Sequence, residues 1–303
     1  ITEIPQTPLS HINLKAEQNK TPNAFIKDAS THPEIAPFID QNIYYRVTAD
    51  GFEIRSATEE EVEAWFEAIR PANPQVPQRD LSITEIRPLS RIQFNNSDAF
   101  GAKAANVAEL RRIIPRNAPN GYAIPFYFYD EFMKAGDLYS EAQAMMEQPL
   151  FRNSALFRDA LLKSFRQKIK DAPLPAWMFD AVGALQESIG PDTTLRLRSS
   201  TNNEDLEGFN GAGLYSSFTH YLDEGHLEKT VKQVWASHWN YRAFEEREFW
   251  RIDHFSAASA SSSSLNFTSP SSASSSEDSP SSSTSSSFSS SPSSSFFSSL
   301  SDI

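Results

Sequence analysis

The sequence contains no cysteine. This absence excludes disulfide bonds, thiolate catalysis and cysteine-ligated metal sites. No apolar run approaches the ~20 residues that a membrane-spanning helix needs, so no membrane partner is expected. Basic residues are also scarce: 27 Lys and Arg stand against 39 Asp and Glu, for a net charge of −12. Nucleic acid is therefore not an expected partner, because phosphate backbones require a basic surface.

No export signal is expected from the first residues of the chain. The segment 1–4 has no basic stretch and leads into no apolar core, so we do not expect a secretory signal peptide there. We therefore expect a cytoplasmic protein. Since the chain does not open with Met, we also expect that the natural start of the protein lies upstream.

The composition changes abruptly after Phe255. The segment 256–303 is mostly serine with scattered Pro and Phe. Such a composition buries too little apolar surface to offset the entropy of ordering the chain. We predict a disordered low-complexity tail over 256–303, which is either a natural flexible segment or an artefact of a frameshift or a wrong join in the gene.

Residues 1–70 are predicted to form one small unit. Alternating apolar runs at 42–47 and 51–55 flank a turn and predict a β-hairpin. Thr58 and Glu61 have the spacing of a capping box, and apolar residues at helical spacing follow them. The three prolines within 71–79 lie in a polar context, which predicts an interdomain linker over 71–80.

Residues 81–255 alternate helical and extended patterns, so the expected fold class is α/β or α+β. Val107, Leu110 and Ile114 are expected to face the core from the first helix. The aromatic cluster 122–129 is also interpreted as core. The expected helices are 103–114, 155–170, 176–189 and 227–250, and the expected strands are 121–125 and 194–198.

The segment Arg196–Gly213 carries the most informative chemistry. A strand leads Arg198 into a stretch of hydroxyls, amides and three glycines. Arginine binds phosphate through two donors at once, glycine permits close backbone approach, and free backbone N–H groups bind anions. The residues alone favour a polyphosphate-binding loop and a glycine-rich surface hairpin about equally.

Three segments in the same order carry a family resemblance: Gly101–Leu110, Arg196–Gly213 and Val234–Ala243. Together they resemble the ATP-binding domain of phosphoenolpyruvate synthase and pyruvate phosphate dikinase. The third is also close to the form found in the glucan water dikinases. The resemblance implies that 81–255 is the N-terminal part of an ATP-grasp-like nucleotide-binding domain.

The resemblance also implies roles for individual residues. It assigns Lys103 and Arg198 to the ATP phosphates, and it places Ser199, Thr201 and the Glu204–Asp205 pair in the nucleotide-binding loop. The implied roles are backbone contact with ATP for Thr201 and loop ordering for the two acids. Lys103 stands at the start of a predicted helix, where the helix dipole favours anions. Without the motif it would be interpreted as a solvated surface lysine.

The segment Thr7–Ala24 resembles the phosphohistidine motif of the family's swivelling domain. His11 takes the place of the histidine that accepts and carries a phosphoryl group, a task that suits neutral imidazole near pH 7. The segment departs from the pattern, since the preceding Gly-Gly is absent and Glu17 replaces an arginine. The resemblance implies a partial swivelling domain at 1–70, in an order typical of the glucan water dikinases.

Other charged residues receive structural interpretations. Arg196 shares a strand face with Arg198 and is expected either beside the phosphates or in a salt bridge. Arg242 is expected to form an ion pair in helix packing. The remaining histidines match no motif and are interpreted as structural: His32, His220, His226, His238 and His254.

The resemblance implies an ATP-dependent phosphotransferase that moves a phosphoryl group from ATP to His11 and then to pyruvate. An α-glucan is the alternative acceptor, and a non-catalytic nucleotide-binding or regulatory module is the alternative function. Mg²⁺ is expected for the complete enzyme, but its acidic ligands belong to a second lobe that would follow Asp253. We therefore expect no metal ligands in this fragment and little turnover by the chain alone. The oligomeric state is not predicted.

Overall fold

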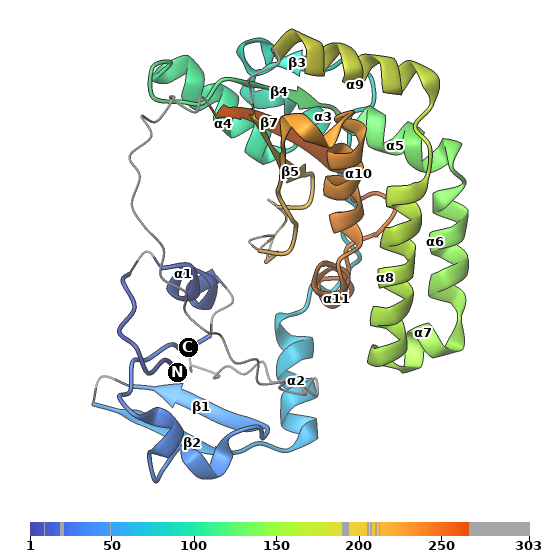
Figure 1. Cartoon of the computed structure of the whole chain (residues 1–303). Coiled ribbons are helices and arrows are strands. Elements are labelled where there is room, and N and C mark those ends of the chain that lie inside the picture. The colour runs from blue at the N-terminus through green and yellow to red at the C-terminus, as the bar shows by residue number, and fades with distance from the viewer. Residues whose placement is uncertain are drawn as a thin grey trace, which may run out of the picture. The chain divides into compact units, whose positions relative to one another are not determined.

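The computed structural model describes residues 1–266, except 9, 19–20, 49, 190–193, 205, 207, 210 and 212 (Figure 1). The chain divides into two compact units, whose described parts are 1–70 and 71–266. The predicted tail beyond 266 lies outside the described residues. No helix in the described ranges combines the length and apolarity needed to cross a membrane.

The first unit is built around the predicted hairpin. Strands β1 (Ile43–Val47) and β2 (Phe52–Ser56) pair antiparallel, with Tyr45 opposite Ile54. The unit also contains α1 (His11–Gln18), η1 (Ala29–Thr31), η2 (Ala36–Phe38) and α2 (Glu59–Ile69).

The capping box of α2 is confirmed, because the Thr58 hydroxyl accepts from the Glu61 amide and the Glu61 carboxylate accepts from the Thr58 amide. The assignment of this unit to a swivelling domain stays a prediction.

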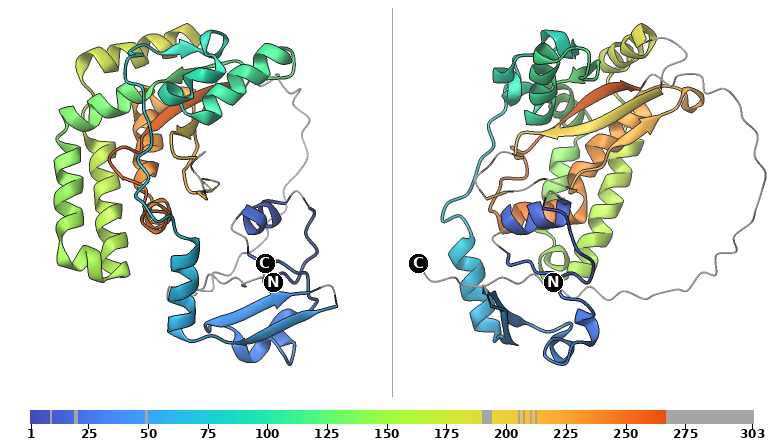
Figure 2. Two further views of the ribbon diagram at one scale, coloured as in Figure 1. Left: turned by 180° about the vertical axis from the view of Figure 1, so that it is seen from behind. Right: turned by 90° about the vertical axis from the view of Figure 1, so that its left-hand side faces the viewer.

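The second unit contains a five-stranded sheet in the order β3-β4-β7-β5-β6, antiparallel throughout. The mixed helix and strand content is confirmed, and the antiparallel pairing gives the α+β class. Figure 2 shows β5 and β7 side by side in this sheet. The strands are β3 (Arg87–Pro88), β4 (Gly121–Ile124), β5 (Thr194–Thr201), β6 (Phe218–His220) and β7 (Ser259–Asn266).

Helices cover both faces of this sheet. The larger core packs α5, α8 and α10 against Leu195 and Leu197 of β5, and a smaller core packs α3 and α4 against Ala123. The helices are η3 (Leu89–Arg91), η4 (Phe94–Asn96), α3 (Ser97–Phe100), α4 (Ala102–Ile113), α5 (Phe126–Ala135), α6 (Leu138–Glu147), α7 (Pro149–Asn153), α8 (Ala155–Asp171), α9 (Ala176–Ile189), η5 (Leu222–Glu224), α10 (Glu228–Ala236), η6 (Ser237–Trp239) and α11 (Tyr241–Phe249).

The single long helix predicted at 227–250 is wrong. The chain tightens into η6 after Ala236 and then extends at Asn240, whose ψ is 141°, before α11 begins. Apolar residues on both sides of the break remain buried, so their periodicity does not reveal it. The break turns the Asn240 side chain to the backbone carbonyl of Leu214.

The predicted inward face of α4 is partly wrong. Leu110 and Ile114 are 45% and 41% exposed, whereas Ala104, Ala105 and Ala108 are buried. Alanine lets the helix axis approach the sheet closely, because it carries only a methyl group. The larger aliphatic side chains therefore lie at the margin of the contact.

The predicted disordered tail is wrong for 256–266. The Ser256 amide donates to the Asp253 carboxylate, and β7 then pairs with both β4 and β5. Because both neighbours supply backbone partners, the strand forms without the β-branched side chains usual in a central strand. Ala260 within the strand and Ala258 just before it pack into the larger core.

The predicted linker at 71–80 belongs to the second unit. Gln75 forms a parallel bridge with Ile252: its amide donates to the Arg251 carbonyl, and its carbonyl accepts from the Asp253 amide. These bonds fix the middle of the segment, so it is not a free linker.

The histidines of the larger core are buried as neutral bases. His238 is fully buried, with no hydrogen bond on either ring nitrogen among the described residues. Burial lowers the pKa of His238 well below its ordinary value and also lowers the pKa of His254. The interpretation of both as structural agrees with this burial.

Serine-to-alanine substitutions within β7 are expected to change the free energy of unfolding differently, depending on whether the hydroxyl removed is hydrogen-bonded. The Ser261 hydroxyl is buried without a described partner, whereas the Ser263 hydroxyl donates to the Tyr122 carbonyl. Ser261→Ala should leave the free energy of unfolding unchanged or raise it by about 1 kcal/mol, and Ser263→Ala should lower it by about 1 kcal/mol. Urea unfolding measures both. Equal losses for the two variants would contradict this account of β7.

The free energy of unfolding is expected to fall as the pH drops below 6.5. The pKa values of His238 and His254 are depressed in the folded state, so only the unfolded chain takes up their protons in that range. Each histidine can contribute up to about 1.4 kcal/mol per pH unit. Urea unfolding at pH 7.5 and 5.5 should show the loss, and His238→Gln should reduce the slope. An unchanged slope would rule out His238 as a source.

Candidate functional site

The N-terminus of α4 is fastened directly to the end of β5. The Ser200 hydroxyl accepts a hydrogen bond of 3.0 Å from the Ala104 amide in the first turn of α4. Gly101 precedes the helix at φ +79°, and a Cβ there would stand 2.3 Å from the Ser200 hydroxyl oxygen. Only glycine fits this position, because any side chain would separate the helix from the strand.

The alternation of β5 sorts its side chains between two faces. Arg196 and Arg198 share the face of Ser200, on which α4 lies, whereas Leu195 and Leu197 enter the larger core. The Arg198 side chain is exposed and makes no hydrogen bond or ion pair within the described ranges. The Arg196 side chain donates to the Thr219 hydroxyl at 2.8 Å and forms no salt bridge with a described residue.

Two predicted site residues lie on the opposite face. Ser199 and Thr201 are 3% and 0% exposed, and alternation points them away from Arg198. The Thr201 hydroxyl has no partner within the described part of the chain. The structure therefore does not bring these two hydroxyls together with Arg198.

Lys103 and Glu204 form an ion pair across the site. The Lys103 Nζ lies 2.7 Å from the Glu204 Oε1, with side chains 48% and 9% exposed. Lysine has three N–H donors, so two remain for a further anion. Gly211 lets its backbone pack on this acid: a Cβ there would stand 2.8 Å from the Glu204 Cγ. The predicted partner Asp205 lies outside the described residues.

His11 lies in the first unit, as the first residue of α1. Its side chain is outside the described part of the structure. The phosphocarrier assignment therefore stays a prediction.

Asparagines at the loop ends were not predicted as functional. The Asn202 side chain donates to the Gln78 and Ser256 carbonyls and accepts from the Ala258 amide. Asn240, at the break before α11, donates to the Leu214 carbonyl. These bonds fix both ends of the β5–β6 connection. The available signal was an asparagine directly after a strand, a residue that favours side-chain-to-backbone bonds.

The arginine expected to pack between helices is misassigned. Arg242 is exposed and makes no ion pair with any described residue. Arg247, which follows Arg242 by five residues in α11, is fully buried and donates to the ring of His254.

The aromatic cluster predicted at 122–129 contributes to the core, since Phe126, Phe128 and Tyr129 are buried.

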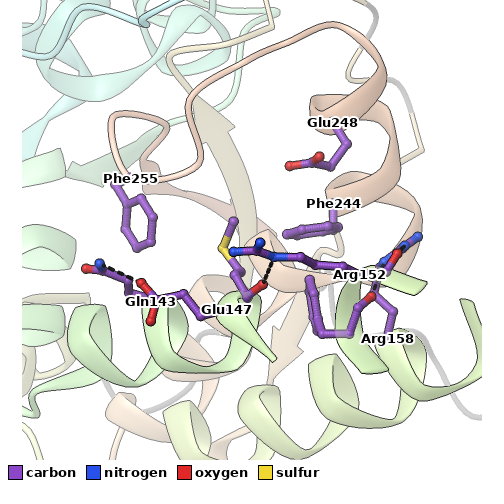
Figure 3. Close-up of a pocket in the computed structure, with 9 residues that line it drawn as sticks. Gln143, Glu147, Arg152, Arg158, Phe244, Glu248 and Phe255 are labelled. Atoms are coloured by element: carbon purple, nitrogen blue, oxygen red, sulfur yellow. Dashed lines mark hydrogen bonds between the residues drawn. The ribbon is translucent and has the colours of Figure 1, made fainter. Parts of the chain in front are cut away.

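A cavity of about 400 Å³ lies elsewhere in the second unit, among α6, α7, α8 and α11 (Figure 3). Its wall combines two arginines, two glutamates and three phenylalanines with other residues. None of the predicted site residues contributes to it. The lining residues are Gln143, Met146, Glu147, Phe151, Arg152, Arg158, Phe244, Glu248 and Phe255.

No cluster of three or more acidic or histidine side chains suited to a metal occurs within the described residues. Among the described acidic residues, Glu204 pairs with Lys103, and one carboxylate does not form the oxygen cage that Mg²⁺ requires. The described residues therefore do not by themselves form a magnesium site.

Several known proteins are similar to this chain in sequence. The chain is 26% identical over 176 residues to a phosphoenolpyruvate synthase of Deinococcus radiodurans, covering 57% of this chain and 22% of that protein. It is 25% identical over 166 residues to a phosphoenolpyruvate synthase of Aeropyrum pernix, covering 53% and 20%. A rifampicin phosphotransferase of a Streptomyces species is 26% identical over 160 residues, covering 51% and 18%.

The chain thus matches only about a fifth of the length of these curated relatives. The family described as "Pyruvate phosphate dikinase, AMP/ATP-binding domain" matches residues 97–262. This range begins with α3 and enters β7, and it includes Lys103, Arg198 and Glu204. The chain belongs to the pyruvate phosphate dikinase AMP/ATP-binding domain family.

Proposed function

We propose that the second unit binds the phosphates of ATP between the N-terminus of α4 and the exposed Arg198 side chain of β5. The observation that carries the proposal is the bond between the Ala104 amide and Ser200. It places Lys103 in the first turn of α4, next to the strand face that carries Arg198. Helix dipole, ammonium and guanidinium then favour an anion at one place.

The charges of the site are available to such a ligand. Arg198 is exposed and without a partner in the described ranges. Glu204 orients the Lys103 ammonium while using one of its three donors. A polyphosphate could therefore take bonds from both cations without first breaking the ion pair.

Ser199 and Thr201 cannot reach this ligand with their hydroxyls in the described conformation, because both side chains enter the core. A contact through the backbone of Thr201 stays part of the proposal. Asp205 keeps its predicted role in ordering the loop.

In the longer protein the bound ATP would serve phosphoryl transfer of the dikinase type, with His11 as the carrier and Mg²⁺ as cofactor. The phosphoenolpyruvate synthases among the relatives support pyruvate as the acceptor. A rifampicin phosphotransferase is also among the relatives, and it matches 51% of this chain. We infer that this unit supplies the nucleotide, whereas other parts of each protein select the acceptor.

Removing both site cations should weaken nucleotide binding strongly. Lys103→Ala combined with Arg198→Ala should raise the Kd for a non-hydrolysable ATP analogue at least about 100-fold, because two charge-assisted bonds are lost. Calorimetry with and without Mg²⁺ measures the Kd.

The matched control combines Arg112→Ala with Lys168→Ala, which removes the same two charges from exposed ion pairs elsewhere. The control should bind as the unsubstituted chain does. Equal weakening in both variants would show that net charge, rather than this site, governs binding.

A further inference from the structure

A buried arginine on α11 connects two parts of the second unit. Arg247 of α11 is 0% exposed, although burying a guanidinium is costly unless its donors are bonded. Its Nε donates to the His254 Nδ1 at 3.0 Å, and its Nη1 donates to the Tyr215 hydroxyl at 3.5 Å. The arginine therefore joins two side chains that lie far apart in the sequence.

On one side of Arg247, the hydrogen bonds continue through His254 to Glu248. Arginine can only donate, so the His254 Nδ1 must accept and the proton of the neutral ring sits on Nε2. That nitrogen donates to the Glu248 carboxylate at 2.6 Å. The His254 ring also stacks on Phe244 at 4.2 Å. Glu248 and Phe244 line the cavity of Figure 3, so this end is held by the wall of α11.

On the other side of Arg247, the hydrogen bonds continue through Tyr215 to the loop that carries Glu204. The Tyr215 hydroxyl accepts from the Asn203 side chain at 2.7 Å, and the tyrosine ring stacks on His238. A Cβ at Gly211 would stand 3.4 Å from the Tyr215 ring and 2.8 Å from Glu204. Tyr215 and Glu204 therefore pack around the same glycine.

We propose that Tyr215 and Arg247 are positioning residues of the phosphate site. Through Asn203 and Gly211 they hold Glu204 where it orients Lys103. This inference rests on the proposed function, since it assigns the network to the site of ATP binding. Neither residue would contact the phosphates directly. Instead, the buried Tyr215 and Arg247 would fix the position of the exposed Lys103 ammonium through Glu204.

Tyr215→Phe tests the proposal, because it removes the hydroxyl and keeps the stacked ring. Tyr129→Phe is the matched control: it deletes a hydroxyl in the same core that accepts from the Trp239 indole and makes no hydrogen bond to the described residues of the β5–β6 connection. Both variants should lose similar global stability, about 1 kcal/mol.

Hydrogen exchange distinguishes the two variants. The amides of Leu206, Phe209 and Leu214 donate to carbonyls within the loop. Their exchange should accelerate about tenfold in Tyr215→Phe and should follow the global change alone in Tyr129→Phe. Loop amides that exchange alike in the two variants would overturn the proposal.

Binding of the ATP analogue supplies the second readout. Tyr215→Phe should raise the Kd about threefold or more, whereas Tyr129→Phe should leave it unchanged, because only the former lowers the fraction of loops in the competent arrangement. Faster loop exchange with an unchanged Kd would overturn the link to the phosphate site. If the unsubstituted chain binds no analogue, the proposed function fails, and the exchange comparison still decides whether Tyr215 holds the loop.

Discussion

The hydrogen bond between the Ala104 amide and the Ser200 hydroxyl joins segments 96 residues apart in the sequence. It satisfies one of the amides that a helix leaves unpaired at its start, and it does so with a side chain from a strand end. The bond thereby fixes the start of α4 against the end of β5, where the phosphate site is proposed. Gly101 makes the contact possible, and the burial of Ser200 shields it from water.

The site combines elements held by the cores, α4 and β5, with a connection between β5 and β6 that is held at fewer points. The helix start and the strand face are fixed by the two cores on either side of the sheet. The connection between β5 and β6 is held at a few points instead, by Asn202, Asn203 and Asn240. The break before α11 thus has a use, because a continuous helix would not present Asn240 to the loop.

Much of this arrangement could be predicted from local patterns. The hairpin, the capping box and α9 follow from alternation, side-chain chemistry and helical periodicity, which depend on near neighbours. Lys103 and Arg198 were predicted from their motifs, and the structure places them at adjacent elements. The family assignment of the motifs is confirmed by the match over 97–262.

The features that the sequence patterns mispredicted or missed depend instead on contacts between residues far apart in the sequence. Serines are poor strand formers, yet β7 exists because two neighbouring strands supply its backbone partners. The face of α4 was misassigned because close approach to the sheet favours alanine over leucine. Tyr215 and Arg247 match no local pattern, and their connection exists only once α11 has packed behind the loop.

The position of β7 has a consequence for how the second unit folds. It is the last described strand in the sequence, but it lies in the middle of the sheet between β4 and β5. During synthesis both neighbours leave the ribosome before the strand that joins them, so each half waits with an unpaired edge. Such edges invite pairing with other chains, and non-local pairing is slow. We therefore expect the sheet to be completed only after β7 has left the ribosome, late in the folding of the second unit.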